Sequence, residues 1–364
     1  MKYNRRVSRA RAVLLSGVGV FALLQLGLAV VVESWWVQLR DPCFGVKVVA
    51  LEQRMRNSEF QGNGSAGRRE PHGKVVVMLG TSRTDDALRG SQLEGALAQE
   101  LDYPVIVYNL GLPGTSEQAE LLYLERLLDR QIRPDLLLIE VLPAHLHRDW
   151  TRDTVWIPPD RLSWRDWHLL HEDHLPRRAL RNGWRETCAL PWYAHRFAVL
   201  GALTLHMVPG EVRENYAYSR DRCGWRSPID ERPSSDRCSR ATAQARSEYG
   251  PTLQRFELGG SNCAALRMLL GRCRDCRLPA VLVLMPEASE FRNLYPPAAW
   301  AQVQAFLDQL RDEFDVPLIN ARNWVADADF MDTHHVFVPG AKTFTERLGR
   351  EVVLPFFQAQ IASR

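Results

Sequence analysis

The chain has 364 residues, of which 46% are hydrophobic and 24% are charged. This is the composition of a globular protein, and it excludes a disordered, collagen-like or small disulfide-stapled chain. The formal net charge is only +3, from 46 basic and 43 acidic side chains, so charge gives no reason to expect a nucleic-acid partner.

The N-terminal segment is the most apolar part of the chain. Residues 12–32 carry no charged side chain, and at 1.5 Å per residue they reach about 31 Å, enough to cross a hydrocarbon core of about 30 Å. Basic residues precede this run, and the first acidic residue, Glu33, follows it. By the positive-inside rule, we predict one transmembrane signal-anchor in the cytoplasmic (inner) membrane, with the N-terminus inside and the main domain extracytoplasmic, or periplasmic.

Two features beside this segment support an anchor. Trp35 and Trp36 stand where interfacial aromatic residues are expected. The alternative is a cleaved signal peptide, whose apolar core is normally about 7–15 residues long and ends before a pair of small residues. The run here is longer and no clean small-x-small site follows it, which favours an uncleaved anchor.

Composition divides the chain into three regions. We expect a cytoplasmic basic tail and anchor at 1–32, a stalk with a Gly- and Ser-rich linker at 33–72, and an α/β domain at 73–364. Residues at about 150–256 are rich in Trp, Arg, His and Pro and are interpreted as a largely helical inserted cap. Within them, the apolar stretch 197–208 is too short to span a membrane, so it is either a buried helix or a membrane-facing patch.

Short apolar runs that end at turn residues predict buried strands, and helical spacing of apolar residues predicts helices between them. The strands are expected at 74–80, 104–109, 135–140, 279–285 and 316–320, and two of the helices at 116–130 and 298–314. The alternation predicts an α/β fold with a flavodoxin-like parallel sheet of about five strands and helices on both faces.

The seven cysteines are compatible with export but do not require it. Cys223 and Cys238 flank a polar loop, so a disulfide between them is one candidate. Cys273 and Cys276 form a metal half-site, a redox pair or two unrelated thiols, and a structural zinc site would need a second pair at suitable spacing, which is not clear here. Disulfides, free thiols and a metal stay open from the sequence, but we expect no cofactor and assign no metal ligands.

Three segments follow predicted strands, where the sites of open α/β sheets form. In Gly80-Thr-Ser82-Arg83, the serine lies on a tight strand-to-helix turn that exposes its hydroxyl near free backbone N–H groups. In Asn109-Leu-Gly-Leu-Pro-Gly114, the glycines allow close approach of the backbone and offer N–H donors to an oxyanion. Taken alone, the serine could simply cap a helix and the glycines could form an ordinary turn.

The third segment is Asp332-Thr-His-His335. An Asp and a His three residues apart on one turn can aim the imidazole at a serine while the carboxylate fixes its tautomer. Taken alone, both could be surface loop residues. The joint pattern is stronger, and it predicts that the Ser82 hydroxyl and a ring nitrogen of His335 lie within about 2.6–3.5 Å.

These motifs resemble the conserved blocks of the SGNH/GDSL hydrolase superfamily, over roughly residues 74–150 and 277–356. Gly80-Thr-Ser82 is similar to the nucleophile block, with Thr in place of the usual Asp, and 109–114 is similar to the second block, whose glycine N–H helps to form the oxyanion hole. Asp332-x-x-His335 matches the final block. The resemblance implies a nucleophile, its orienting acid and a general base, which are Ser82, Asp332 and His335. It implies oxyanion-hole donors among Ser82, Asn109, Gly111 and Gly114.

The third block departs from the family pattern. The family places an Asn there, whereas this chain has Ile139-Glu-Val-Leu-Pro-Ala-His145. Either His145 or a backbone N–H substitutes, or the hole is weaker, and losing one donor costs about 100–1,000-fold in rate. The candidate substrate contacts are Arg83, His145, Arg292 and Tyr295. For each of them a structural role is the alternative, such as pairing of Arg83 with Asp85 or Asp86.

The resemblance implies a membrane-anchored, GDSL-like esterase or an O-acyltransferase, for example an O-acetyltransferase, that acts through a catalytic triad on a polysaccharide or another acyl ester. A transferase would need a membrane-bound partner that donates acyl groups. The alternative is a catalytically silent scaffold or binding protein in a cell-envelope or polysaccharide-modification system, which the missing Asn favours and the retained Ser82, Asp332 and His335 disfavour. A thiol-redox or metal protein built on Cys273 and Cys276 is a third interpretation.

Overall fold

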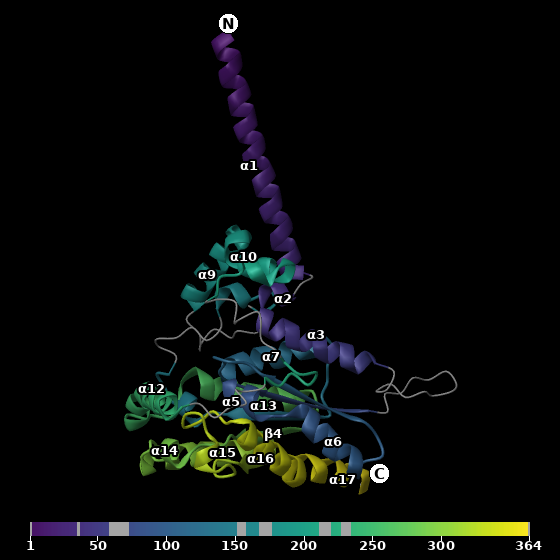
Figure 1. The fold of residues 1–364 in the computed structure, drawn as a ribbon, viewed down its shortest axis with the longest axis vertical. Helices are drawn as coiled ribbons and strands as arrows, with labels where there is room; N and C mark the ends of the chain where they lie inside the picture. Colours follow the sequence, from purple (N-terminus) through teal and green to yellow (C-terminus); the bar gives the residue numbers. More distant parts are fainter. Residues whose placement is uncertain are drawn as a thin grey trace, which may run out of the picture. The chain divides into compact units, whose positions relative to one another are not determined.

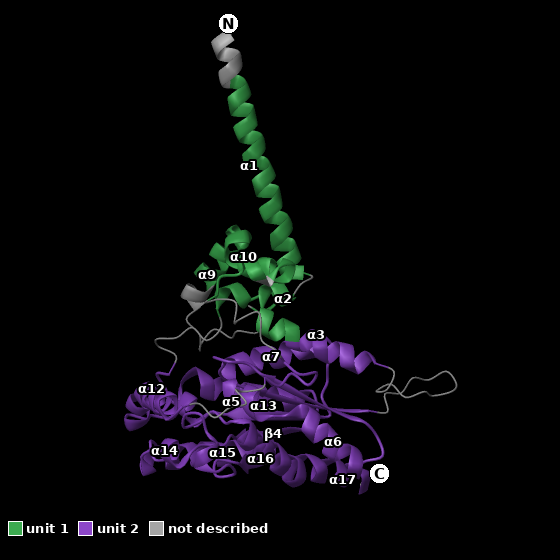
Figure 2. Ribbon diagram, in the orientation of Figure 1, with its two compact units in different colours: residues 1–46, 157–217 green, residues 47–156, 218–364 purple. Residues whose placement is uncertain are grey.

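A computed structural model describes residues 2–34, 37–57, 73–150, 158–166, 177–210, 220–226 and 234–362. The predicted interfacial pair Trp35 and Trp36, the Gly- and Ser-rich linker and parts of the predicted cap lie outside the described residues. The chain forms two compact units (Figure 2). Unit 1 contains residues 1–46 and 157–217, and unit 2 contains residues 47–156 and 218–364.

The sheet of unit 2, within the described residues, has five parallel strands in the order β2-β1-β3-β4-β5. The strands are β1 (Lys74–Gly80), β2 (Val105–Gly111), β3 (Leu136–Val141), β4 (Ala280–Leu284) and β5 (Leu318–Asn320). Most of their residues are buried, as expected when helices cover both faces of a parallel sheet. The order is the flavodoxin-like one, so the predicted fold class is confirmed.

Helices form a layer on each side of this sheet. On one side α7 packs against α13, and α13 packs against α15; on the other side α6 packs against α16. The bounds are α5 (Ser82–Ala87), α6 (Gly90–Glu100), α7 (Glu117–Asp129), η1 (Pro143–Leu146), α12 (Ser235–Gln254), α13 (Gly260–Asp275), α14 (Ser289–Arg292), α15 (Pro297–Phe314), η4 (Asp327–Asp329), α16 (Val338–Leu348), η5 (Gly349–Val353) and α17 (Leu354–Ala362). The core on the α16 side joins Val76 and Met78 of β1 to Phe344 and Phe357.

Unit 1 is helical in its described residues. It contains α1 (Lys2–Ser34), α2 (Val37–Arg40), the first turn of α3 (Pro42–Arg56), η2 (Pro159–Arg161), α9 (Arg177–Ala189), α10 (Pro191–Leu203) and η3 (Leu205–Met207). Residues Ser8–Ser34 of α1 are long and apolar enough to cross a membrane, by length and composition. Within this unit, α9 and α10 lie beside the C-terminal part of α1 (Figure 1).

The structure differs from the sequence-based boundaries in two places. The expected stalk contains α3, and from Lys47 onward this helix belongs to unit 2, where Val48 and Leu51 are fully buried. The expected cap is divided: 157–217 belongs to unit 1, whereas α12 belongs to unit 2. Both differences arise because amphipathic segments that are separated in the sequence find their apolar partners only in the tertiary fold.

The candidate disulfide between Cys223 and Cys238 is not formed. Cys223 is a free, buried thiol, and its Sγ accepts hydrogen bonds from Ser91 and Arg54, each at 3.2 Å. Cys273 is likewise a buried free thiol, and Cys276 is a free thiol at the end of α13. Cys273 therefore packs as a small apolar side chain, whereas the Cys223 thiol also accepts hydrogen bonds.

Candidate active site

The turn after β1 holds Ser82 at the start of α5. Thr81 caps this helix, and its hydroxyl accepts a hydrogen bond from the Arg83 N–H at 3.1 Å. The buried carboxylate of Glu140 lies at the end of β3 and accepts hydrogen bonds from the Thr81 N–H at 2.8 Å and the Thr84 hydroxyl at 2.7 Å. Only glycine fits at position 80, because a Cβ there would overlap the side chains of Thr84 and Glu140. The serine is therefore presented on a rigid, braced turn.

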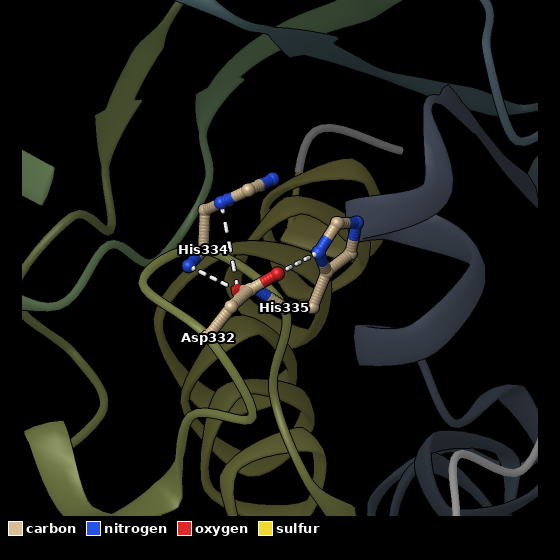
Figure 3. A group of neighbouring side chains, drawn as sticks. All are labelled: Asp332, His334 and His335. Carbon is tan, nitrogen blue, oxygen red and sulfur yellow. Dashed lines mark hydrogen bonds and ion pairs between the residues drawn. The ribbon is translucent and has the colours of Figure 1, made fainter. Parts of the chain in front are cut away.

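A continuous chain of hydrogen bonds joins Ser82 to the segment before α16. The Ser82 Oγ lies 2.8 Å from His335 Nε2, and His335 Nδ1 lies 2.7 Å from Asp332 Oδ2. The other carboxylate oxygen, Asp332 Oδ1, accepts the backbone N–H groups of His334 and His335, both at 2.7 Å (Figure 3). The Ser82–His335 distance falls inside the predicted range, so the convergence of these two segments is confirmed.

Electrostatics favour an ionised Asp332 and a basic His335. Burial alone would raise the pKa of the Asp332 carboxyl, but the charge and hydrogen bond of His335, with the His334 N–H, hold that pKa well below its usual range. Burial would lower the pKa of His335, but the Asp332 carboxylate outweighs it, so the pKa of His335 is raised above its ordinary 6.5. The pair therefore has the charge pattern of a carboxylate that orients and strengthens a base.

A second histidine, His334, lies beside the first and was not singled out from the sequence. Its ring packs against His335, Phe291 and Tyr249, with centroid separations of 4.2, 5.0 and 5.2 Å. Burial lowers the pKa of His334 well below its ordinary value, so its ring is neutral. We interpret it as part of the wall that holds His335 in place.

Two of the predicted oxyanion-hole residues have structural roles instead. The Asn109 side-chain amide donates to the carbonyl oxygens of Thr84, Asp85 and Leu88 at 2.7, 3.3 and 2.9 Å. Its own oxygen accepts the Gly111 N–H at 2.9 Å. Both groups are therefore already bonded within the protein, and the assignment of Asn109 and Gly111 as oxyanion donors is wrong.

The loop after β2 still lies against the serine turn. The Leu112 N–H and the Thr115 hydroxyl both donate to the Gly80 carbonyl, at 2.8 and 2.9 Å. Gly114 lies in this loop, is exposed and has a φ of +73°, a conformation that favours glycine. Within the described part of the chain, the N–H groups of Ser82 and Gly114 donate no backbone hydrogen bond, so these two remain the candidate donors.

Arg83 is too deeply buried for the predicted contact with an acidic substrate. Its side chain is only 2% exposed, and it donates to the carbonyl oxygens of Met285 and Pro286 at 3.1 and 3.0 Å. The guanidinium also lies 3.4 Å from Glu287 and 3.8 Å from Glu140. Neither of the anticipated partners, Asp85 or Asp86, is its ion-pair partner. Arg83 instead ties the nucleophile turn to the loop after β4.

Two further predicted substrate contacts, Arg292 and Tyr295, also bond or pack within the protein. Arg292 donates to the carbonyl oxygens of Glu287 and Arg322. Tyr295 is 6% exposed, and the Arg322 guanidinium lies 4.9 Å from its ring centroid. These residues therefore brace the loop after β4, and the structure gives no support to direct contact with a substrate.

His145, the proposed substitute for the missing Asn, is also buried. Its Nδ1 lies 3.5 Å from a carboxylate oxygen of Glu117, and its carbonyl oxygen accepts a hydrogen bond from Asn262 at 2.9 Å. Its ring packs against Trp150 at 4.9 Å. This set of contacts describes a histidine that stabilises the loop after β3. The two remaining alternatives from the sequence are a backbone N–H as the substitute and a weaker oxyanion hole.

Metal-ligating side chains gather at one place among the described residues, and these are Asp332, His334 and His335. Both oxygens of Asp332 already accept hydrogen bonds from the two histidines, and His335 Nε2 lies against Ser82. The geometry of these donors is that of a proton relay, so we assign them to it.

The sequence did not indicate the roles of three buried charged residues near the serine turn, which are Glu140, Glu287 and Lys47. Glu140 carried a readable signal, since an acidic residue that ends an apolar strand must find partners when it is buried. Glu287 accepts from Arg322 at 2.5 Å, and Lys47 donates to Asp85 at 2.5 Å and to the Gly111 carbonyl at 2.6 Å. No pattern in the sequence joins these distant positions.

No protein-family model matches the chain, and no curated protein matches it in sequence. Solved structures with a similar arrangement include a lipase/acylhydrolase from Enterococcus faecalis, at 12% identity, covering 77% of this chain and 95% of that one with a TM-score of 0.32. A catalytic mutant of the acetylxylan esterase Axe2 from Geobacillus stearothermophilus is 13% identical; the match covers 76% of this chain and 93% of that one, with a TM-score of 0.36. A carbohydrate acetylesterase family member from Sinorhizobium meliloti is 13% identical; the match covers 77% of this chain and 97% of that one, with a TM-score of 0.32. These values are too low to assign a family or a function.

Proposed function

We propose that this protein is a membrane-anchored acyl ester hydrolase, or an O-acyltransferase, of the SGNH type, with Ser82 as nucleophile, His335 as general base and Asp332 as its orienting acid. The observation that carries this proposal is the unbroken relay from Ser82 Oγ through His335 to Asp332, with contacts of 2.8 and 2.7 Å. Such a relay activates a hydroxyl that is otherwise a weak nucleophile.

The reaction follows from the atoms of this relay. His335 Nε2 accepts the Ser82 proton as Oγ attacks the ester carbonyl carbon, and the carbonyl oxygen becomes an oxyanion. We assign the N–H groups of Ser82 and Gly114 as the candidate donors to that oxygen, because neither donates a backbone hydrogen bond in the described part of the chain. Collapse of the tetrahedral species breaks the bond to the leaving alcohol, which takes the proton from His335. Ser82 is left carrying the acyl group.

The second half of the reaction releases the acyl group. Water or a sugar hydroxyl gives its proton to His335 and attacks the acyl carbon, and the collapse of this second tetrahedral species returns the proton to Ser82 Oγ. Water makes the protein a hydrolase and a sugar hydroxyl makes it a transferase. We propose an extracytoplasmic polysaccharide or another acyl ester as substrate, and a transferase would receive its acyl groups from a membrane-bound partner.

Labelling with a fluorophosphonate tests the nucleophile directly. We expect the full-length chain to be labelled and Ser82→Ala to be unlabelled, because the probe reacts only with an activated hydroxyl. Ser235→Ala is the matched control, since Ser235 is an exposed serine of unit 2, and it should label like the parent chain. Labelling that survives in Ser82→Ala, or that is missing from all three proteins, overturns the assignment.

The alternative is a catalytically silent binding or scaffold protein on the same fold. One observation favours it: the loop after β3 carries no Asn, and the histidine in its place is buried against Glu117. A folded chain that binds an acylated glycan but shows neither labelling nor turnover would support this alternative over the hydrolase.

A further inference from the structure

The inserted helices of unit 1 share their packing with the membrane-spanning candidate. The Trp192 N–H at the start of α10 donates to the Gln25 side-chain oxygen of α1 at 3.1 Å. Further along, Ala198 of α10 joins Val32 and Leu39 in a small apolar cluster. The chain thus places a second helix directly beside α1, although about 160 residues separate them in sequence.

The position of Gln25 along α1 determines whether α10 lies in lipid or in water when α1 spans a membrane. Gln25 lies inside the apolar stretch Ser8–Ser34. It is nine residues before the end of that stretch, which corresponds to about 13 Å along a helix. When α1 spans a bilayer, a helix bonded to Gln25 therefore lies at the depth of the adjoining leaflet and not in bulk water.

The outward side chains of this region suit that depth. Large apolar side chains are exposed here to an extent that is unusual for a water-facing surface. Leu203 is 78% exposed, and Tyr193 and Met207 are 67% and 66% exposed. Trp192, at the start of α10, is also exposed.

Cations accompany these apolar side chains. The Arg196 guanidinium lies 4.1 Å and 4.3 Å from the ring centroids of Tyr193 and Phe197, so its charge is held against two aromatic rings. On α9, Arg181 and Arg185 are exposed, and such arginines pair with phosphate groups.

A cavity of about 310 Å³ lies between α1 and these helices. Its walls combine apolar side chains, such as Val30 and Trp184, with the ionisable Glu33, Arg40 and His195. A cavity whose walls hold both apolar and ionisable side chains suits the region of a phospholipid where the acyl chains meet the headgroup.

We propose that α9, α10 and η3 form a lipid-binding platform, whose exposed apolar side chains insert into the leaflet next to the main domain while the arginines contact lipid phosphates. The partner is the phospholipid of the same membrane that α1 spans. This inference rests on the membrane anchoring in the proposed function and is independent of Ser82 chemistry.

Site-specific photocross-linking tests the platform in the full-length chain. The photoreactive residue p-benzoylphenylalanine is placed at Leu203 or Tyr193, and at Ile361 as a matched control. Ile361 is an exposed apolar residue, at 50%, on α17 of unit 2. Each chain is reconstituted into vesicles of phosphatidylethanolamine and phosphatidylglycerol that contain radiolabelled phospholipid. We expect at least about tenfold more lipid adduct at 203 and 193 than at 361.

The outcomes separate the platform from the rest of the proposal. Adducts at 203 and 193 no more frequent than at 361, or cross-links to a second copy of the chain instead of lipid, overturn the platform while the chain remains anchored. Extraction of every chain by alkaline carbonate overturns the anchor and the platform together. Fluorophosphonate labelling of Ser82, measured on the same samples, reports the catalytic assignment separately.

Discussion

At the residue scale, the Asp332 carboxylate is expected to control catalysis through the tautomer of His335. In Asp332→Asn, the amide nitrogen would face Nδ1, so the ring would carry its proton on Nε2 and could not accept one from Ser82. We expect kcat for an activated acetyl ester to fall by about 10⁴-fold. The control is Asp312→Asn, because Asp312 is an exposed carboxylate on α15, and it should leave kcat unchanged. A loss below about tenfold would contradict the orienting role.

The same pair predicts the pH dependence of the reaction. Because the pKa of His335 lies above its ordinary 6.5, the neutral ring that serves as base is lost as the pH falls through this raised value. We expect kcat/KM to rise with pH, with an inflection above 6.5, since this parameter reports the free enzyme. In Asp332→Asn, the residual activity should show its inflection at lower pH, because the carboxylate charge that raises the pKa is gone. A pH-independent kcat/KM across the neutral range would count against His335 as the base.

These residues also show how far the sequence carries the site. Ser82, Asp332 and His335 were predictable, because segments that follow parallel strands converge at one edge of a sheet. Asn109 and Gly111 were assigned wrongly, because an amide and a glycine after a strand suit an oxyanion hole and a strand-end brace equally well. Only the tertiary contacts of Asn109 with α5 decide between these two roles.

At the element scale, α3 is more than the stalk that its sequence predicts. Its Lys47 is fully buried and bonds Asp85, three residues after the nucleophile, and the carbonyl of Gly111. Burial lowers the pKa of Lys47 to about 8, although the Asp85 carboxylate opposes this shift. A charge this deep is tolerated only because its partners are in place, and that requirement is set by the fold and not by local sequence.

Substitution of Lys47 therefore tests α3 as a structural part of unit 2. We expect Lys47→Ala to lower the free energy of unfolding by about 3–5 kcal/mol, because it leaves the Asp85 carboxylate buried without its lysine. Lys47→Met keeps the apolar stem and removes only the ammonium, so it separates lost charge from lost packing. Chemical denaturation followed by circular dichroism gives both values. A change within about 0.5 kcal/mol for Lys47→Ala would show that α3 does not stabilise this unit.

At the scale of the whole molecule, the sequence predicts the sheet better than the division into units. Each strand of unit 2 is a short apolar run that can be recognised locally, and all five were expected near their observed positions. The division depends on long-range pairing, because the chain passes between the units after residues 46, 156 and 217. The unit that contains α1 is thereby connected to the unit that contains Ser82 at three points along the chain, and no local pattern indicates this.

The anchor itself gives the last prediction. We expect the recombinant chain to stay in the membrane fraction after alkaline carbonate, with an intact mass of 41.6 kDa. The double variant Val20→Arg with Leu23→Arg should be released, because each arginine near the centre of a spanning helix costs about 2.5–3.5 kcal/mol of insertion free energy. The matched pair Val20→Ala with Leu23→Ala should stay, since both residues are exposed on α1 and alanine adds no charge. A soluble parent chain that has lost roughly its first 30 residues, the length of a signal peptide, would instead show a cleaved signal and no anchor.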